Sequence, residues 1–117
     1  METRKGGCHC GKVRYAADVD LTQPVIECNC SICAGKGMLL SFVPENALRI
    51  ESGEELLTEY RFNTDKIAHL FCKVCGMQTF AKATDPQGNP TYAINVRSID
   101  DIDLGALDRM PFDGKSR

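Results

Sequence analysis

The segment Cys72-Lys73-Val74-Cys75-Gly76 presents two thiols at metal-binding spacing before a turn-forming glycine. Cys8-His9-Cys10-Gly11 offers two more thiols near the start of the chain. Each spacing lets neighbouring sulfurs turn toward one ion, and four thiolates in a tetrahedron are a set that zinc favours. The two pairs therefore predict a closed, structural zinc site that ties the first strand to the later half of the chain.

A third cluster, Cys28-Asn29-Cys30-Ser31-Ile32-Cys33, carries three thiols within six residues. Three protein ligands leave one coordination position open, which is the pattern of a catalytic zinc. We therefore expect two Zn²⁺ ions per chain. The predicted ligands are Cys8, Cys10, Cys72 and Cys75 at the structural ion, and Cys28, Cys30 and Cys33 at the open, catalytic one.

Other assignments of the ligands stay open from the sequence. The last four cysteines of the chain could share a zinc-ribbon site, although their pairs are farther apart than the ~15–20 residues common in ribbons. His9 or His69 could close the three-cysteine set. His69, however, lies in an alternating strand pattern typical of a packed residue, and His9 lies between two ligands of the other ion. The three thiols could also remain without metal.

The bulk composition limits the class of protein. With 117 residues, of which 43% are hydrophobic and 26% charged, the chain is expected to form one globular domain over residues 1–117. A net charge of −2 with scattered basic residues argues against nucleic acid and acidic membranes as partners. Neither a signal-peptide core nor a membrane-spanning apolar run is recognisable, so we expect a cytoplasmic protein. There its seven cysteines stay reduced and available for metal.

Short alternating apolar patterns separated by turns predict a mainly β, antiparallel domain with little helix. The expected strands lie at residues 13–19, 38–43, 48–51, 57–62, 67–72, 77–84 and 92–96, with turns at 52–53, 63–65 and 85–90. The segment 98–107 could hold a helical turn, and the tail from Pro111 is expected to be loosely ordered. The aromatic residues expected in the core are Tyr60, Phe62, Phe71, Phe80 and Tyr92.

Taken together, the motifs resemble the glutathione-dependent formaldehyde-activating family, also described as the centromere protein V family. The resemblance runs nearly end to end, through residues 6–15, 28–33 with Gly37, Gly53-Glu54, 71–76 and Ile94-Asn95-Val96-Arg97. It implies a small Mss4-like (β-tent) architecture built around a structural zinc on the four-cysteine set. It also implies that the three-cysteine set holds the zinc of catalysis. Asn29, Ala34 and Met77-Gln78 depart from the residues common in that family.

The resemblance implies carbon–sulfur lyase activity, namely interconversion of S-(hydroxymethyl)glutathione with glutathione and formaldehyde. A thiol such as glutathione and an aldehyde would then be the partners. We expect the open zinc to hold the substrate thiol deprotonated near an aldehyde carbon. Two other classes of function fit the same residues: a non-enzymatic zinc module that binds a protein, and a redox-responsive zinc–thiolate cluster. The sequence indicates no general acid or base and no oligomeric state.

Overall fold

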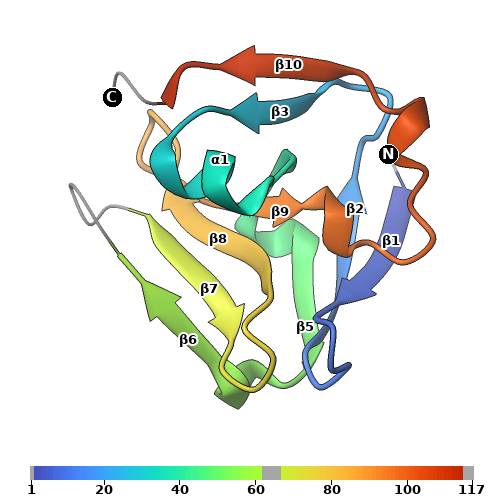
Figure 1. Cartoon of the computed structure of the whole chain (residues 1–117), viewed down its shortest axis with the longest axis vertical. Helices are drawn as coiled ribbons and strands as arrows, with labels where there is room; N and C mark the ends of the chain where they lie inside the picture. Colours follow the sequence, from blue (N-terminus) through green and yellow to red (C-terminus); the bar gives the residue numbers. More distant parts are fainter. Residues whose placement is uncertain (1, 62–66, 115–117) are drawn as a thin grey trace.

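A computed structural model describes residues 2–61 and 67–114 of the chain (Figure 1). The strands are β1 (Glu2–Gly7), β2 (Arg14–Val19), β3 (Val25–Cys28), β4 (Leu40–Pro44), β5 (Leu48–Ser52), β6 (Leu57–Tyr60), β7 (Ala68–Cys72), β8 (Gln78–Thr84), β9 (Pro90–Asn95) and β10 (Arg109–Phe112). The helical elements are α1 (Ser31–Lys36) and the 3₁₀ turns η1 (Glu45–Ala47), η2 (Glu54–Leu56), η3 (Val96–Ser98) and η4 (Leu104–Ala106).

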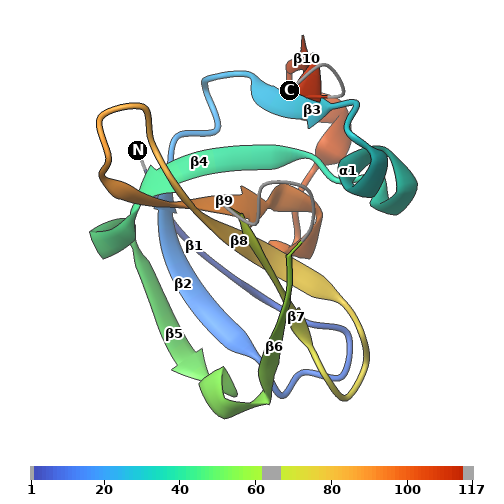
Figure 2. The same ribbon diagram turned by 90° about the vertical axis from the view of Figure 1, so that its left-hand side faces the viewer.

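The strands form two sheets. The smaller sheet has the order β1-β2-β5, and the larger has the order β10-β3-β4-β9-β8-β7-β6. All neighbours are antiparallel except β10, which pairs with β3 in parallel. Figure 2 shows β2 and β5 on one side of the lower half of the molecule and β6 and β7 on the other. This arrangement confirms the expected mainly β class.

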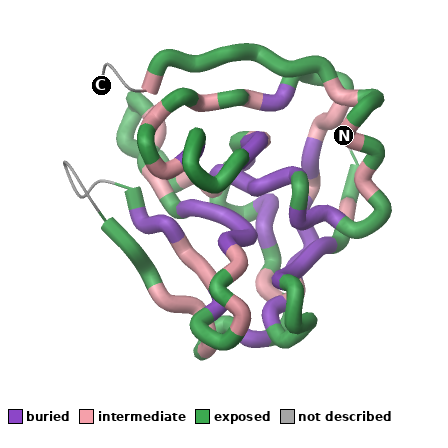
Figure 3. Tube along the Cα trace, in the orientation of Figure 1, coloured by how far each residue is buried: buried purple, intermediate pink, exposed green. Residues whose placement is uncertain are grey.

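The core lies between the two sheets, and β2, β8 and β9 contribute buried apolar residues to it. Figure 3 colours the buried residues purple along these strands. Tyr15, Phe80 and Ile94 are fully buried there, and burial of each side chain this size contributes roughly 1.5–3 kcal/mol. The Tyr15 and Phe80 rings meet edge to face with centroids 5.7 Å apart. The Tyr15 hydroxyl lies 2.6 Å from Ser98 Oγ, so its polar atom stays hydrogen-bonded inside the core.

Several expectations about individual segments need correction. Tyr60 is half exposed rather than in the core, because it lies on the edge strand β6, whereas Phe80 is buried as expected. Phe71 and Tyr92 are partly buried. The segment from Pro111 does not begin a loose tail: Pro111 and Phe112 belong to β10, in register with Glu27 and Cys28. Phe62 and the predicted turn at 63–65 lie outside the described residues.

Strands β1 and β10 were not among the expected strands, and helix α1 is a further element that the strand patterns did not indicate. It begins directly after Cys30, whose backbone is extended, and ends at Gly37, whose φ of 66° lies in the left-handed region that glycine adopts without strain. The helix carries Cys33 on its buried side. In the part of the chain that the structure describes, no helix combines the length and apolar character needed to cross a bilayer.

Candidate metal centres

Two turns from different sheets bring the first cysteine cluster together. Cys8 and Cys10 lie between β1 and β2 of the smaller sheet, and Cys72 and Cys75 lie at the β7–β8 turn of the larger one. The four sulfur atoms all lie within 4.8 Å of one another. In Figure 1 both turns lie at the lower end of the molecule.

The two turns are built alike, which explains why the local sequences bring sulfurs into place. The amide of Cys8 donates to the carbonyl of Val13 (3.1 Å), and the amide of Cys72 donates to the carbonyl of Met77 (3.0 Å). Each turn is then closed by a glycine after its second cysteine. Gly76 takes a φ of 81°, and its amide reaches the Cys72 carbonyl at 2.7 Å.

The sulfur spacing of this cluster fits a tetrahedral zinc. A Zn–S bond of about 2.3 Å implies sulfur atoms about 3.8 Å apart in a regular tetrahedron. Cys8 Sγ lies 3.5 Å from Cys10 Sγ, which lies 3.7 Å from Cys72 Sγ. Cys8 and Cys72 are buried, so solvent reaches the cluster mainly from the Cys10 side.

The four thiols differ in how readily each loses its proton. Amide donation, chiefly from Met77, lowers the pKa of Cys75 to about 6. The Lys12 amide lowers the pKa of Cys10, but partial desolvation and the three neighbouring thiols together outweigh it and raise this pKa to about 11. The cluster therefore offers an anionic sulfur at neutral pH, and metal binding must displace the remaining protons.

The second cluster is local in sequence and forms where β3 passes into α1. Cys28 ends β3, Cys30 precedes the helix, and Cys33 lies on it; their sulfurs are also within 4.8 Å of one another. The Ala34 amide donates to the Cys30 carbonyl at 2.8 Å, and the Met38 amide donates to the Cys33 carbonyl at 3.0 Å. These bonds fix both ends of the helix that holds the third sulfur.

This second cluster is half open. Cys28 and Cys30 are partly exposed, whereas Cys33 is buried and packs against Met38 and other apolar side chains. Burial, reinforced by the neighbouring thiols, raises the pKa of Cys33. Burial also opposes ionisation of Cys30, but hydrogen bonds, first from the Cys33 amide, leave its pKa lowered overall.

The geometry separates the two groups as the spacing predicted. Within residues 2–61 and 67–114 neither His9 nor His69 joins a group of potential metal ligands, and the last four cysteines do not form a ribbon-type set. His9 is exposed, and His69 is buried against Gln78. The occupancy of both clusters by zinc stays a prediction.

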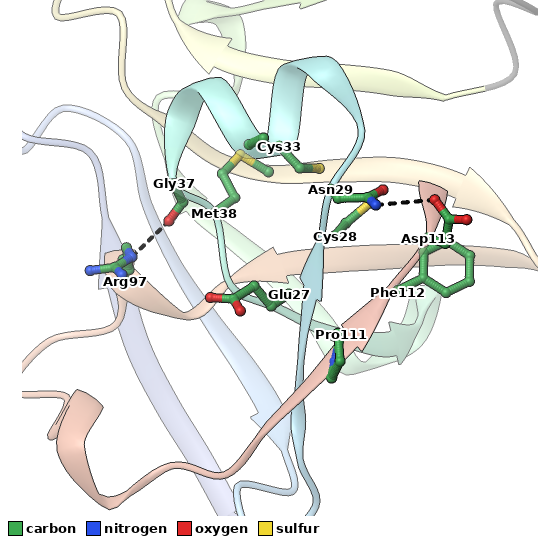
Figure 4. A pocket seen from close by; sticks show the side chains of 11 residues that line it. Glu27, Cys28, Asn29, Cys33, Gly37, Met38, Arg97, Pro111, Phe112 and Asp113 are labelled. Atoms are coloured by element: carbon green, nitrogen blue, oxygen red, sulfur yellow. Dashed lines mark hydrogen bonds between the residues drawn. The ribbon is translucent and has the colours of Figure 1, made fainter. Parts of the chain in front are cut away.

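A cavity of about 530 Å³ opens beside the three-cysteine cluster. Cys28 and Cys33 line it together with Met38, Arg97 and Phe112 (Figure 4). Its volume is within the range of small-molecule sites. The arrangement leaves room for a ligand next to two of the three sulfurs, which a closed structural site would not need.

The C-terminal segment, expected to be loose, forms one wall of this cavity. The amide of Asn29 donates to the Phe112 carbonyl (3.1 Å), and its side chain donates to Asp113 Oδ1 (3.0 Å). A Cβ atom on Gly114 would collide with Cys28 Sγ. The sequence carried no signal for this contact, because the pairing of β10 with β3 is not local.

A second feature missed from the sequence is a series of hydrogen-bonded polar side chains beside the three-cysteine cluster. Lys36 Nζ donates to Gln78 Oε1 (2.7 Å), and Gln78 Nε2 donates to His69 Nδ1 (3.2 Å). Desolvation lowers the pKa of Lys36, while the Cys33 thiolate acts in the opposite direction. Lys36 follows Cys33 by one helical turn, and this spacing is the signal that could have indicated a charge beside the cluster.

The fold and the two clusters define a small, mainly β domain with one four-cysteine and one three-cysteine centre. The chain belongs to the family whose model is described as glutathione-dependent formaldehyde-activating enzyme, which it matches over residues 3–110. Its Mss4-like architecture is the one expected from the family resemblance.

A solved crystal structure is also similar to the chain. It is that of a Rhodobacter sphaeroides protein determined by a structural genomics consortium, with a TM-score of 0.77 and 29% sequence identity. The match covers 91% of this chain and 99% of that one.

Proposed function

We propose that the chain is a zinc-dependent carbon–sulfur lyase that acts on thiol–aldehyde adducts such as S-(hydroxymethyl)glutathione. The observation that supports this function most directly is the three-cysteine cluster whose Cys28 and Cys33 line a cavity of about 530 Å³. Membership of the formaldehyde-activating family supports the same chemistry.

In this proposal the two clusters have different tasks. Cys8, Cys10, Cys72 and Cys75 hold a structural zinc that joins the sheets. Cys28, Cys30 and Cys33 hold a zinc with an open position. That ion supplies, when bound, a site at which a thiol with an ordinary pKa near ~8.5 is deprotonated at neutral pH.

The reaction requires little covalent chemistry from the protein. In the lyase direction the C–S bond of the hydroxymethyl adduct breaks, its electron pair stays on sulfur, and the hydroxyl oxygen loses a proton as the carbonyl forms. In the reverse direction sulfur attacks the aldehyde carbon, and the new alkoxide takes a proton from water. The chain's residues position the thiol beside the aldehyde, so the rate enhancement comes mostly from proximity.

Lys36 has an electrostatic task in this proposal. Three thiolates outweigh the charge of one Zn²⁺ by a unit, and a substrate thiolate adds another negative charge. Lys36 is the cation whose pKa responds to the charge on Cys33. Its ammonium group stabilises the anionic cluster without being a ligand.

The test is the exchange of glutathione with formaldehyde, followed by NMR with the spontaneous reaction subtracted. The zinc-loaded protein should accelerate exchange above background, and Cys30→Ser should abolish that acceleration. Metal analysis separates loss of the site from loss of the fold, because Cys30→Ser should retain one ion per chain. No rate above background, or an unchanged rate in Cys30→Ser, would contradict the lyase function and leave a non-enzymatic zinc module.

A further inference from the structure

We infer that the cavity beside Cys28 and Cys33 has a carboxylate-binding end formed by Arg97, so that the chain selects thiols that carry a carboxylate. The position of the thiol rests on the proposed function. The carboxylate end rests on separate observations of charge, geometry and connection to the cluster.

Arg97 is the cationic residue among the described residues that line the cavity. The two acidic lining residues already have partners. Glu27 pairs with Arg109 at 3.2 Å, and Asp113 accepts a hydrogen bond from Asn29 at 3.0 Å. Arg97 therefore provides the attraction for an anion in a cavity whose other charged groups, the thiolates included, are negative.

Arg97 is exposed, and its guanidinium group is held by one of its donors. Arg97 Nε donates to the Gly37 carbonyl at 2.8 Å, which fixes the plane of the group. Its two terminal nitrogens have no hydrogen-bond partner within residues 2–61 and 67–114. A guanidinium group fixed in this way can donate hydrogen bonds to both oxygens of a carboxylate side by side.

The backbone of Arg97 is fixed as well. Its amide donates to Asn95 Oδ1 at 3.2 Å, and Asn95 Nδ2 donates to the Gln78 carbonyl at 2.9 Å. Asn95 is 7% exposed, so its bond to the Gln78 carbonyl is largely protected from water. A preorganised donor loses less conformational entropy on binding than a free surface arginine does.

The hydrogen bond from Arg97 to the Gly37 carbonyl also connects Arg97 to the three-cysteine cluster. Gly37 ends helix α1, which carries Cys33, and the next residue, Met38, donates its amide to the Cys33 carbonyl. Figure 4 shows Arg97 at one end of the cavity and Phe112 and Asp113 at the other, with Cys33 between them. The distance between the sulfur position and the carboxylate position is therefore set by one short helix.

These features indicate the class of ligand. One end of the molecule is a thiol, the other is a carboxylate, and the part between them contacts the apolar side chains of Met38 and Pro111. Small thiol peptides and mercaptocarboxylic acids have this form. Neutral or cationic thiols, such as 2-mercaptoethanol or cysteamine, lack the group that Arg97 recognises.

The test uses binding of an unreactive analogue, so that it does not depend on catalysis. S-Methylglutathione and its diester are titrated into zinc-loaded wild-type protein and into Arg97→Gln by calorimetry. Wild type should bind the acid about tenfold or more tightly than the diester, as expected for a charge-assisted bidentate contact. Arg97→Gln should lose this preference, and Arg97→Lys should recover only part of it.

Arg49→Gln is the matched control, since it removes the same charge from β5, where Arg49 pairs with Asp18. It should bind the acid as wild type does. Equal affinity of wild type for acid and diester, no saturable binding of the acid, or an unchanged preference in Arg97→Gln would each overturn the inference. A binding preference that depends on Arg97 in a protein without lyase activity would overturn the proposed function alone.

Discussion

Cys10 and Cys72 lie 62 residues apart in the sequence, yet their sulfur atoms are 3.7 Å apart in the fold. Cys10 belongs to the turn between two strands of the smaller sheet, and Cys72 ends a strand of the larger one. A metal ion held between them would join the two sheets at the end of the molecule where each makes a turn. A domain of this size has a modest core, so we expect such a connection to contribute a large share of its stability.

Replacing Cys72 by serine should unfold the protein at 37 °C. Cys72 is fully buried, and its loss removes a ligand and leaves a hydroxyl in the apolar surroundings of Val13. Metal binding at a structural site contributes a free energy comparable to the whole free energy of unfolding of a domain, which is about 5–15 kcal/mol. Thermal unfolding followed by circular dichroism measures the loss.

Cys30→Ser is the comparison for that variant. Cys30 belongs to the cluster proposed for chemistry, so its replacement should change the melting temperature by no more than a few degrees. Equal destabilisation by the two substitutions would contradict the division of the cysteines into a structural and an open site.

Gly114→Ala should weaken metal binding at the three-cysteine cluster by about tenfold and leave the four-cysteine cluster unchanged. The added methyl group would collide with Cys28 Sγ, so the sulfur or the C-terminal segment must move. Exchange of the bound zinc for Co²⁺ in the folded, zinc-loaded protein measures the effect, because the thiolate absorption bands of Co²⁺ report each site.

Gly35→Ala is the matched control on the helix of the same cluster. A Cβ atom at Gly35 meets no other group within 4 Å, and alanine favours helix. This variant should bind Co²⁺ at both clusters as wild type does. Unaltered Co²⁺ binding by Gly114→Ala would show that the C-terminal segment does not constrain Cys28.

Lys36→Met should lower the affinity of the three-cysteine cluster for a substrate thiol several-fold, since it removes a positive charge beside an anionic centre. The same substitution should raise the pKa of His69, because the Lys36 ammonium helps to lower it. An NMR titration of the His69 imidazole measures this pKa, and loss of packing alone would not be expected to raise it. An unchanged His69 titration would contradict the electrostatic role of Lys36.

Stability should decrease on acidification, in part through His69. Burial first, and the Lys36 ammonium second, hold the pKa of His69 below its ordinary value of 6.5. As the pH falls through about 6.5 the unfolded chain takes up a proton that the folded chain refuses, so the folded state loses stability until His69 itself is protonated. Well above pH 6.5 His69 is neutral in both states, and this loss of stability is absent.

His69→Gln isolates this contribution, because glutamine can accept the bond from Gln78 but does not titrate. Both proteins share the acid-sensitive thiolates, so the difference between their melting temperatures at pH 7.5 and pH 5.5 reports His69. The variant should lose less stability than wild type over this range. An equal loss would contradict the assigned direction of the pKa.

The sequence predicted the grouping of the cysteines because cysteine spacing is local information. Cys28, Cys30 and Cys33 meet through one turn and one short helix, and each pair of the other cluster meets within its own turn. The alternation of residues 13–19 and 77–84 likewise predicted β2 and β8. Helix α1 was not predicted, since six residues are too few to show a helical period.

The surroundings of the open cluster depend on pairings that no local pattern encodes. Arg97 meets Gly37 across 60 residues, and Asn29 meets Asp113 across 84. Gln78, a departure from residues common in the family, receives its bond from Lys36 only because β8 lies beside α1 in the folded chain. These contacts surround the cavity, and they could be identified only from the tertiary structure.

One cysteine cluster should be a closed metal site and the other an open one. This division can be tested with a crystal structure and anomalous maps at the zinc edge, from crystals soaked with glutathione. We expect two zinc ions per chain, one bound by Cys8, Cys10, Cys72 and Cys75, and one bound by Cys28, Cys30, Cys33 and the sulfur of glutathione. A single ion, or a second ion whose fourth ligand is a protein side chain, would contradict it.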